Sequence, residues 1–400
     1  MPVRQLVLKI ASRCNLNCTY CYMYNVGDDT YKKQPKVMSR EVVNETLKKV
    51  RQHCVTHALA EFDFVFHGGE PLLAGREFFE YFIHSADDIL GPGISYSISV
   101  QTNGTLINED WSRFFSENGI LAGVSIDGPE TVHDSHRKYH SGRGSFQDVI
   151  NGLRVLQEHN PASVITVVDP YSDPAALYML LKRWGIERLN TIIPYANYDF
   201  PPLQITGYVE QGLTLFADWL IRLFDIWIKD RKPKPSIMLF DQIISLVLGN
   251  EDAGNDVLGR TRNELLVIES NGSIEPAGSL KICGNGFTKQ GVSILNTGID
   301  DAMTRELVEM YYNSHQHLSP KCSRCMIKDV CGGGLFASRY RSLSGFLNPS
   351  VYCLDWMKLI THIQNAVIDL FPPGNIVHEY ITRLDYEHLR KDYFSTTVMQ

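Results

Sequence analysis

The first half of the chain alternates short apolar runs with longer stretches of helical periodicity. The short runs are rich in β-branched and aromatic residues and predict strands at 6–12, 62–67, 96–101, 121–126, 163–168 and 189–193. Between them, apolar residues recur at helical spacing, for example at 40–57, 76–89 and 145–159. Strands that alternate with helices pair in parallel. The pattern therefore predicts an α/β fold of six β-α units around a parallel sheet.

The second half of the chain loses this alternation. Residues 208–229 carry aromatic and aliphatic side chains at helical spacing, and a second helix is expected at 236–248, after the Lys-Pro-Lys-Pro break at 232–235. We expect the aromatic stripe of 208–229 to be core rather than a substrate surface. These patterns divide the chain into an α/β domain at 1–205, a helical bridge at 206–260, a cysteine-rich domain at 261–360 and a helical tail at 361–400.

Composition narrows the class of protein. The 400 residues are 44% hydrophobic and 21% charged, as in an ordinary globular protein. The formal net charge of −7 disfavours nucleic-acid binding, and no apolar run reaches the roughly 18 residues of a membrane-spanning helix. Nine cysteines, most of them in two clusters, fit metal ligation better than a disulfide framework. We expect a cytoplasmic protein with no nucleic-acid or membrane partner.

The first cluster, Cys14, Cys18 and Cys21, directly follows the first predicted strand. Three thiolates hold only three irons of a 4Fe-4S cluster and leave the fourth iron open. A zinc site would want a fourth ligand, and the nearest candidates, His53 and Cys54, lie downstream in a predicted helix. The spacing therefore favours a cluster with one open iron.

Polar motifs follow the next three predicted strands. They are His67-Gly68-Gly69-Glu70-Pro71, Gln101-Thr102-Asn103-Gly104, and Ser125-Ile126-Asp127-Gly128 with His133-Asp134-Ser135-His136-Arg137. In isolation each reads as a turn, a helix cap or a surface charge. In a parallel barrel, however, the carboxyl ends of the strands form the active site.

The second cluster, Cys322, Cys325, Cys331 and Cys353, surrounds the triple glycine at 332–334. Four thiolates can complete the coordination of an iron-sulfur cluster, and they can equally bind a structural zinc.

Taken together, these motifs resemble those of radical S-adenosylmethionine (SAM) enzymes that carry a C-terminal SPASM domain. The resemblance implies a partial (β/α)6 TIM-like barrel with a SPASM/twitch-like auxiliary-cluster domain at 261–360, and SAM on the open iron. It assigns Glu70 to the amino group of SAM, and Ser125 and Arg137 to its carboxylate or ribose. The implied SAM pocket comprises Tyr20, Gly68, Gly69, Glu70, Gln101, Asn103, Ser125, Asp127 and Arg137.

The chain departs from this family pattern at the second auxiliary cluster of complete SPASM domains. The hairpin expected at 266–277 has no cysteine, and Leu335 stands where a final ligand belongs. We therefore expect two 4Fe-4S clusters, one open and one on Cys322, Cys325, Cys331 and Cys353. Cys54 and Cys283 are interpreted as small buried hydrophobes.

A finer resemblance, carried by the segments at 332–341 and 345–353, is to the FxsB family. It implies an enzyme of ribosomal peptide (RiPP) biosynthesis that removes a β-carbon hydrogen from a precursor peptide and joins side chains into a cyclophane-type macrocycle. A reductant such as flavodoxin or ferredoxin is implied as a partner. With no separate domain before the first strand, leader recognition would use the C-terminal domain or another protein.

Other functions remain open. One is an anaerobic sulfatase-maturating enzyme, which oxidises a Cys or Ser to formylglycine and is expected to keep the second auxiliary cluster. The others are a peptide epimerase and a non-enzymatic SAM-binding scaffold or sensor. For a general base, Tyr195, Asp199 and Asp241 are candidates near the expected barrel ends, and each is equally readable as structural.

Overall fold

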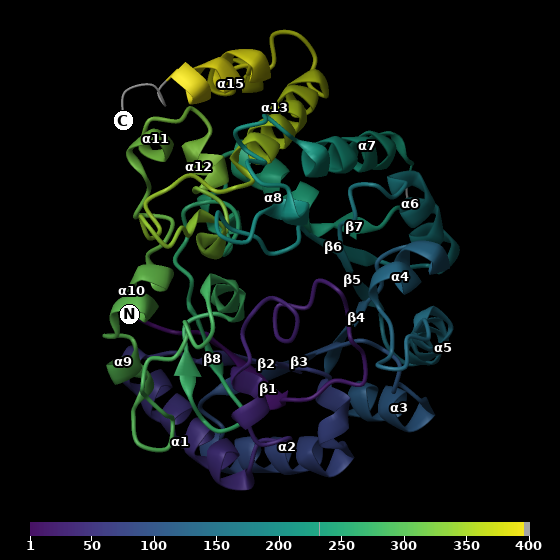
Figure 1. Cartoon of the computed structure of the whole chain (residues 1–400). Coiled ribbons are helices and arrows are strands. Elements are labelled where there is room, and N and C mark those ends of the chain that lie inside the picture. Colours follow the sequence, from purple (N-terminus) through teal and green to yellow (C-terminus); the bar gives the residue numbers. More distant parts are fainter. Residues whose placement is uncertain (232, 396–400) are drawn as a thin grey trace. The chain divides into compact units, whose positions relative to one another are not determined.

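The computed structural model describes residues 1–231 and 233–395 in two compact units (Figure 1). The first unit comprises Met1–Ile165 and Glu264–Tyr312, and the second Thr166–Asn263 and Asn313–Gln400. Lys232 of the predicted break and residues 396–400 of the predicted tail lie outside the described residues. The segment 264–312 joins the first unit. The predicted domain boundaries stay a prediction.

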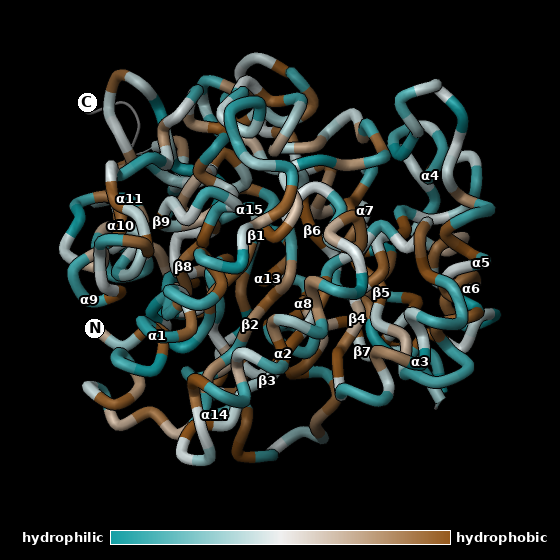
Figure 2. Tube along the Cα trace, turned by 90° about the horizontal axis from the view of Figure 1, so that it is seen from below, coloured by the Kyte–Doolittle hydropathy of each residue, from teal (hydrophilic) through white to brown (hydrophobic). Residues whose placement is uncertain are grey.

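The first unit is built on a sheet in the order β5-β4-β3-β2-β1-β8-β9, parallel except for the final pair. Its strands are β1 (Gln5–Ala11), β2 (Glu61–Gly68), β3 (Ser95–Thr102), β4 (Leu121–Ser125), β5 (Ser163–Val167), β8 (Leu265–Ile268) and β9 (Ile274–Glu275). The tube in Figure 2 is mainly brown along β4 and β5, in keeping with their apolar sequences. The strands predicted in this unit are confirmed to within one or two residues.

Helices cover this sheet by burying one apolar face. On α2, Phe79 and Phe82 pack edge-on against Phe66 of β2, with ring centroids 5.1 and 4.8 Å apart. Ser39 caps α1 by accepting a hydrogen bond from the Val42 amide. The helices of this unit are α1 (Arg40–His57), α2 (Arg76–Leu90), α3 (Glu109–Glu117), α4 (Glu130–His136), α5 (Phe146–Gln157), α9 (Ile299–Ala302) and α10 (Glu306–Tyr312), with 3-10 turns η1 (Thr30–Lys33), η2 (Pro71–Ala74) and η5 (Gly278–Cys283).

The second unit holds the parallel pair β6 (Arg188–Ile192) and β7 (Ser236–Ile237) among helices. These are α6 (Pro174–Arg183), α7 (Leu215–Lys229), α8 (Met238–Val247), α11 (Pro320–Ser323), α12 (Lys328–Cys331), α13 (Cys353–Asp369), α14 (Val377–Tyr380) and α15 (Tyr386–Ser395), with 3-10 turns η3 (Pro202–Gln204), η4 (Glu251–Ala253) and η6 (Phe336–Arg339).

The helix predicted from residue 208 begins only at Leu215. Gly207 and Gly212 adopt positive φ, at 69° and 70°, and the segment between them forms turns. The aromatic stripe of α7 is confirmed as core, because Trp219 and Phe224 are buried.

Two further predictions concern single residues and membrane spans. Cys54 is buried as predicted, whereas Cys283 is only half-buried, because η5 ends there before Gly284 turns the chain at a φ of 147°. Among the helices of residues 1–231 and 233–395, none is long and apolar enough to cross a membrane.

Candidate functional site

The loop that carries Cys14, Cys18 and Cys21 follows β1 and is fastened to the segment after α4. The amide of Asn17 donates to the Lys138 carbonyl at 2.7 Å, and the amide of Thr19 donates to the His136 carbonyl at 3.1 Å. The Thr19 hydroxyl also lies 2.8 Å from His136 Nδ1. These bonds hold the loop over the ends of β1 and β4.

Gly68 and Gly69 let the turn after β2 press against this loop. A Cβ at Gly69 would lie 2.3 Å from the Arg13 carbonyl oxygen and 2.1 Å from the Tyr24 hydroxyl. A Cβ at Gly68, which has a φ of 131°, would lie 2.1 Å from the Ala11 carbonyl oxygen. The amide of Gly69 donates to that carbonyl at 2.8 Å. The two glycines therefore allow a close backbone approach to the end of β1 and to the cysteine loop.

Glu70 ties the turn after β2 to the turn after β3. Its buried carboxylate accepts hydrogen bonds from the Leu72 amide at 3.0 Å, the Thr102 hydroxyl at 2.8 Å and the Asn103 amide at 2.7 Å. Burial raises the pKa of Glu70, while these hydrogen bonds and Arg137 oppose the shift. The carboxylate thus positions two loops, and its pairing with an amino group stays a prediction.

Asn103 extends this link to the cysteine loop. Its amide nitrogen donates to Asn15 Oδ1 at 2.8 Å and lies 3.7 Å from Cys14 Sγ. Beside it, the Gln101 amide donates to the Ser125 hydroxyl at 3.0 Å, which joins the ends of β3 and β4. Residues from four strand ends are therefore brought together around the cysteines.

Arg137 lies beside Tyr20 and Asp127 at the same edge. Its Nη1 donates to the Tyr20 hydroxyl at 2.7 Å and lies 3.9 Å from Asp127 Oδ1, while the Tyr20 hydroxyl donates to Asp127 Oδ2. Arg137 is 8% exposed, and its Nε has no hydrogen-bond partner among the described residues. Burial would lower the pKa of Arg137, but Tyr20, Cys18 and Asp127 hold it well above its usual value. A buried guanidinium with an unused donor suits an anionic ligand.

The three thiols fit an iron-sulfur cluster better than a single zinc ion. Burial raises the pKa of all three, that of Cys14 to about 12, so their thiolate forms need a bound cation for compensation. Within the described residues, no three cysteine sulfurs lie within 4.8 Å of one another. Zn–S bonds of about 2.3 Å would draw tetrahedral ligand sulfurs to about 3.8 Å. Three thiolates leave one iron of a 4Fe-4S cluster open, whereas a zinc ion would want a fourth ligand.

In the second unit, Cys322, Cys325, Cys331 and Cys353 all line one cavity of about 280 Å³. Burial raises the pKa of Cys325, Cys331 and Cys353, that of Cys331 to about 12. Helix ends position the sulfurs: Cys331 closes α12 and Cys353 opens α13. The structure thus brings together the four cysteines predicted to share one cluster.

Arg339 holds the triple glycine beside this cavity, which Gly333 lines, a role that the sequence did not reveal. Its buried guanidinium donates to the carbonyls of Gly332, Gly333 and Gly334 at 2.8, 3.0 and 2.7 Å. All three glycines have positive φ, which orients their carbonyls toward the arginine. In the sequence, the only indication of this contact is that Arg339 follows the triple glycine by five residues.

The hairpin without cysteines carries a buried ion cluster instead. Lys281 Nζ lies 2.9 Å from Glu275, 3.1 Å from Glu269 and 3.5 Å from Asp28, and all four residues are buried. Glutamates on either side of the hairpin turn, Glu269 and Glu275, were a signal that sequence reasoning missed.

The three base candidates fall in the second unit. Asp199 accepts hydrogen bonds from the Ser342 amide at 2.8 Å and hydroxyl at 3.3 Å, and Asp241 accepts one from the Ser236 hydroxyl at 2.5 Å. The first two bonds join segments that lie far apart in the sequence, and the third is local to the start of α8. Tyr195 lines a cavity at the end of β6.

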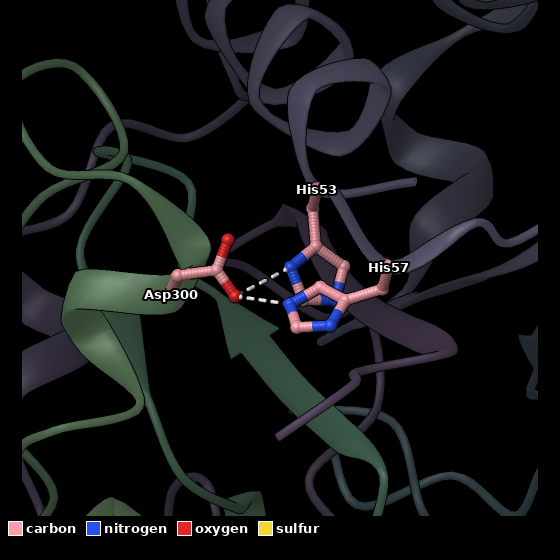
Figure 3. Close-up of side chains that lie close together, drawn as sticks. All are labelled: His53, His57 and Asp300. Carbon is pink, nitrogen blue, oxygen red and sulfur yellow. Dashed lines mark hydrogen bonds and ion pairs between the residues drawn. The ribbon is translucent and has the colours of Figure 1, made fainter. Parts of the chain in front are cut away.

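A group with metal-ligating side chains occurs on the first unit, away from the cysteine loop in sequence. His53 and His57 of α1 both point at Asp300 of α9, at 3.0 and 2.7 Å (Figure 3). The Val3 amide donates to His53 Nε2 at 2.9 Å, so the proton of the neutral ring is on Nδ1. A metal would need the lone pair of that nitrogen. The group therefore fits a hydrogen-bonded link between α1 and α9.

Comparison with known proteins adds the family context. Residues 8–181 match the radical SAM superfamily. The chain is 28% identical over 385 residues to the cysteine-type anaerobic sulfatase-maturating enzyme of Clostridium perfringens strain 13, across 92% of this chain and 99% of that protein. It is 25% identical over 393 residues to the serine-type enzyme of Bacteroides thetaiotaomicron, across 90% and 89%.

Two solved structures are similar to this chain. Native anSMEcpe with bound AdoMet superposes with a TM-score of 0.77 at 25% identity, over 92% of this chain and 98% of that one. Streptococcus suis SuiB bound to S-adenosylmethionine shares the fold, with a TM-score of 0.54 at 15% identity over 88% and 77%.

Proposed function

We propose that this chain oxidises a side chain of a polypeptide substrate. Its residues 8–181 match the radical SAM superfamily, and the chain is closely similar in sequence and structure to anaerobic sulfatase-maturating enzymes. The observation that carries the proposal is the grouping of three half-buried thiols with Arg137, whose Nε has no partner among the described residues. That grouping suits a cluster with one open iron and a carboxylate ligand beside it.

SAM and two 4Fe-4S clusters are the proposed cofactors. When bound, SAM on a reduced cluster supplies a 5'-deoxyadenosyl radical that removes a hydrogen atom from the substrate. Cys14, Cys18 and Cys21 would hold that cluster, and a one-electron donor such as flavodoxin or ferredoxin is the proposed reductant.

The surrounding side chains bind and orient SAM. Arg137 offers its unused Nε to the SAM carboxylate, and Tyr20 with Asp127 fixes the guanidinium plane. Glu70 holds two loop turns at fixed positions through three hydrogen bonds. Because these groups are already hydrogen-bonded to one another, little reorganisation accompanies binding.

The second cysteine set would complete the oxidation. Converting a Ser side chain to formylglycine removes a β-hydrogen atom, one further electron and a proton. The same losses convert a Cys side chain to a thioaldehyde, which water hydrolyses to the aldehyde with release of hydrogen sulfide. Cys322, Cys325, Cys331 and Cys353 share a cavity that suits a fully ligated cluster as the electron acceptor. The cysteine-type and serine-type names of the relatives support a Cys or Ser residue as the target.

Peptide cross-linking is the second candidate. It is favoured because the hairpin carries Glu269 and Glu275, which pair with Lys281 of η5, in place of thiols. It is also favoured by Leu335, since we expected a maturating enzyme to keep a ligand of a further cluster there. Both candidate reactions begin with the removal of a hydrogen atom from the β-carbon of a substrate residue. The specific likeness to the FxsB family stays a prediction.

The test is product analysis with reconstituted protein, SAM, dithionite and a cysteine-containing sulfatase peptide or its serine counterpart. Sulfatase-type maturation predicts an aldehyde that a hydrazide reagent captures. Cross-linking predicts loss of two hydrogens with no aldehyde. C18A should abolish SAM cleavage, whereas C283A, at a cysteine outside both sets, should retain it. A protein that binds SAM without cleaving it would refute both candidates.

A further inference from the structure

The C-terminal helix α15 forms one wall of the cavity that the four cysteines of the second unit line. Its residues Leu389 and Tyr393 belong to the lining, and they are 4% and 8% exposed. Because buried side chains on this wall keep water away, a charge beside the cavity is weakly screened.

The segment before α15 is fastened to α13, the helix that Cys353 opens. Asn365 Nδ2 donates to the Leu384 carbonyl at 2.9 Å, and Asn365 Oδ1 accepts a hydrogen bond from the Leu384 amide at 3.0 Å. Gln364 Nε2 donates to the Thr382 carbonyl at 2.7 Å. α15 itself packs against α13 (Figure 1). The wall is therefore fixed to the helix that carries one of the cysteines.

Lys321, which directly precedes Cys322, is held by this wall. Its Nζ donates to the Tyr393 backbone carbonyl at 2.7 Å and lies 3.9 Å from the centre of the Tyr393 ring. Lys321 is half-buried and lines the cavity itself. The contacts with Tyr393 thus keep the ammonium group beside the cysteines.

Two other cations line the cavity, the exposed Arg324 and the half-buried Lys328. Their side chains donate to backbone carbonyls of their own segment, at 3.2 and 3.4 Å. Among the described residues, no hydrogen bond joins either side chain to α15. Asp392, the only acidic residue in the described lining, is exposed. Lys321 is therefore the cation that the fold fixes at this cavity.

We propose that Lys321, held by α15, raises the reduction potential of the auxiliary cluster and so makes that cluster a better electron acceptor. A 4Fe-4S cluster gains one negative charge when it takes up an electron, and an ammonium group beside it stabilises the reduced form. The inference rests on the proposed function in one respect, that the second cysteine set carries an iron-sulfur cluster. It adds a residue that sets how readily this cluster takes the electron left on the substrate.

The test is a redox titration of the reconstituted full-length protein without substrate. It follows the electron paramagnetic resonance signal of the reduced auxiliary cluster, which is identified as the signal that C325A lacks. K321M removes the ammonium group and keeps an unbranched side chain. At a given applied potential, the ratio of reduced to oxidised cluster should fall about tenfold in K321M, which corresponds to a shift of about 59 mV for one electron. K321R keeps the charge and should titrate like the wild type.

K391M, at an exposed lysine of α15 outside the cavity lining, is the matched control and should also titrate like the wild type. K321Q removes the charge but can still donate to the Tyr393 carbonyl, so it should shift the potential downward even if K321M loses iron.

An unshifted potential in K321M and K321Q, an equal shift in K321R and K321M, or a wild type without a second redox-active cluster would overturn the proposal. The titration contains no substrate, whereas the proposed function is judged by SAM cleavage and by the product. Failure of one is therefore distinguishable from failure of the other.

Discussion

Arg137 donates a hydrogen bond from Nη1 to the Tyr20 hydroxyl at 2.7 Å, while its buried Nε has no partner among the described residues. Tyr20 lies between Cys18 and Cys21, so this contact joins the cysteine loop to the segment after α4. The contact leaves one donor of a fixed guanidinium available beside the proposed open iron. We infer that SAM binding depends on the Nε donor of Arg137.

Replacing Arg137 by lysine should weaken SAM binding about tenfold to a hundredfold, since lysine keeps the charge but cannot present the planar donor pair. Equilibrium dialysis with the reconstituted protein measures the change. R143K, at an exposed arginine paired with Asp148, serves as the control and should bind SAM like the wild type. Unchanged affinity in R137K would remove Arg137 from the SAM site.

A methyl group at Gly69 should displace the cysteine loop. The added Cβ meets the Arg13 carbonyl and the Tyr24 hydroxyl at distances no real Cβ tolerates, and overpacking of this kind costs about 1–3 kcal/mol. G69A should therefore melt at a lower temperature and retain less iron. At Gly93 a Cβ has no neighbour within 4 Å, so G93A should match the wild type in both measurements. Full iron content in G69A would contradict the packing described here.

The cysteine sets predict the iron content of the protein. Two 4Fe-4S clusters correspond to about eight irons per chain, and C325A should leave about four while SAM cleavage by the other cluster persists. Iron and zinc analysis after anaerobic reconstitution provides the count. C283A should keep all the iron of the wild type. About twelve irons in the wild type, or four irons with one tightly bound zinc, would disprove the assignment.

His133 should make the protein sensitive to acid. Its Nδ1 accepts a hydrogen bond from the Asp127 amide at 3.4 Å, and its Nε2 lies 3.0 Å from the Ser145 hydroxyl, so the buried ring is neutral. Burial, followed by the charge of Arg137, lowers the pKa of His133 from 6.5 to about 3. The unfolded chain binds the proton more readily, and stability is therefore present above pH 6.5 and is lost as the pH falls towards 3.

Between pH 7 and pH 5 this group alone should cost about 2 kcal/mol, at about 1.4 kcal/mol per pH unit below 6.5. H133Q, which has no titrating ring, should lose less of its melting temperature over that interval than the wild type does. Parallel pH dependence of the two melting temperatures would show that His133 does not carry the effect.

The strands and most helices of the first unit were predictable because their apolar periodicity is local. In β2, the buried residues Phe62, Phe64 and Phe66 alternate with more exposed positions. This alternation can be recognised from eight consecutive residues. The cysteine loop was also predictable from a local signal, because its three cysteines lie within residues 14–21.

Other features depend on partners far apart in the sequence, and no local pattern reveals them. Arg339 meets the Ser314 carbonyl as well as the triple glycine, and Lys281 meets Asp28, which lies some 250 positions earlier. Glu70 illustrates the same limit at the site itself. Its position in the motif suggested a ligand contact, whereas the structure adds hydrogen bonds to Thr102 and Asn103 that only the folded sheet creates.

We infer that the reaction begins by removing a hydrogen atom from a β-carbon of a polypeptide side chain. The most direct measurement uses a sulfatase peptide whose target cysteine carries deuterium at the β-carbon, with reconstituted protein, SAM and dithionite. We expect deuterium in the 5'-deoxyadenosine that is released. Transfer from an α-deuterated peptide, with none from the β-deuterated one, would contradict it and point to epimerisation.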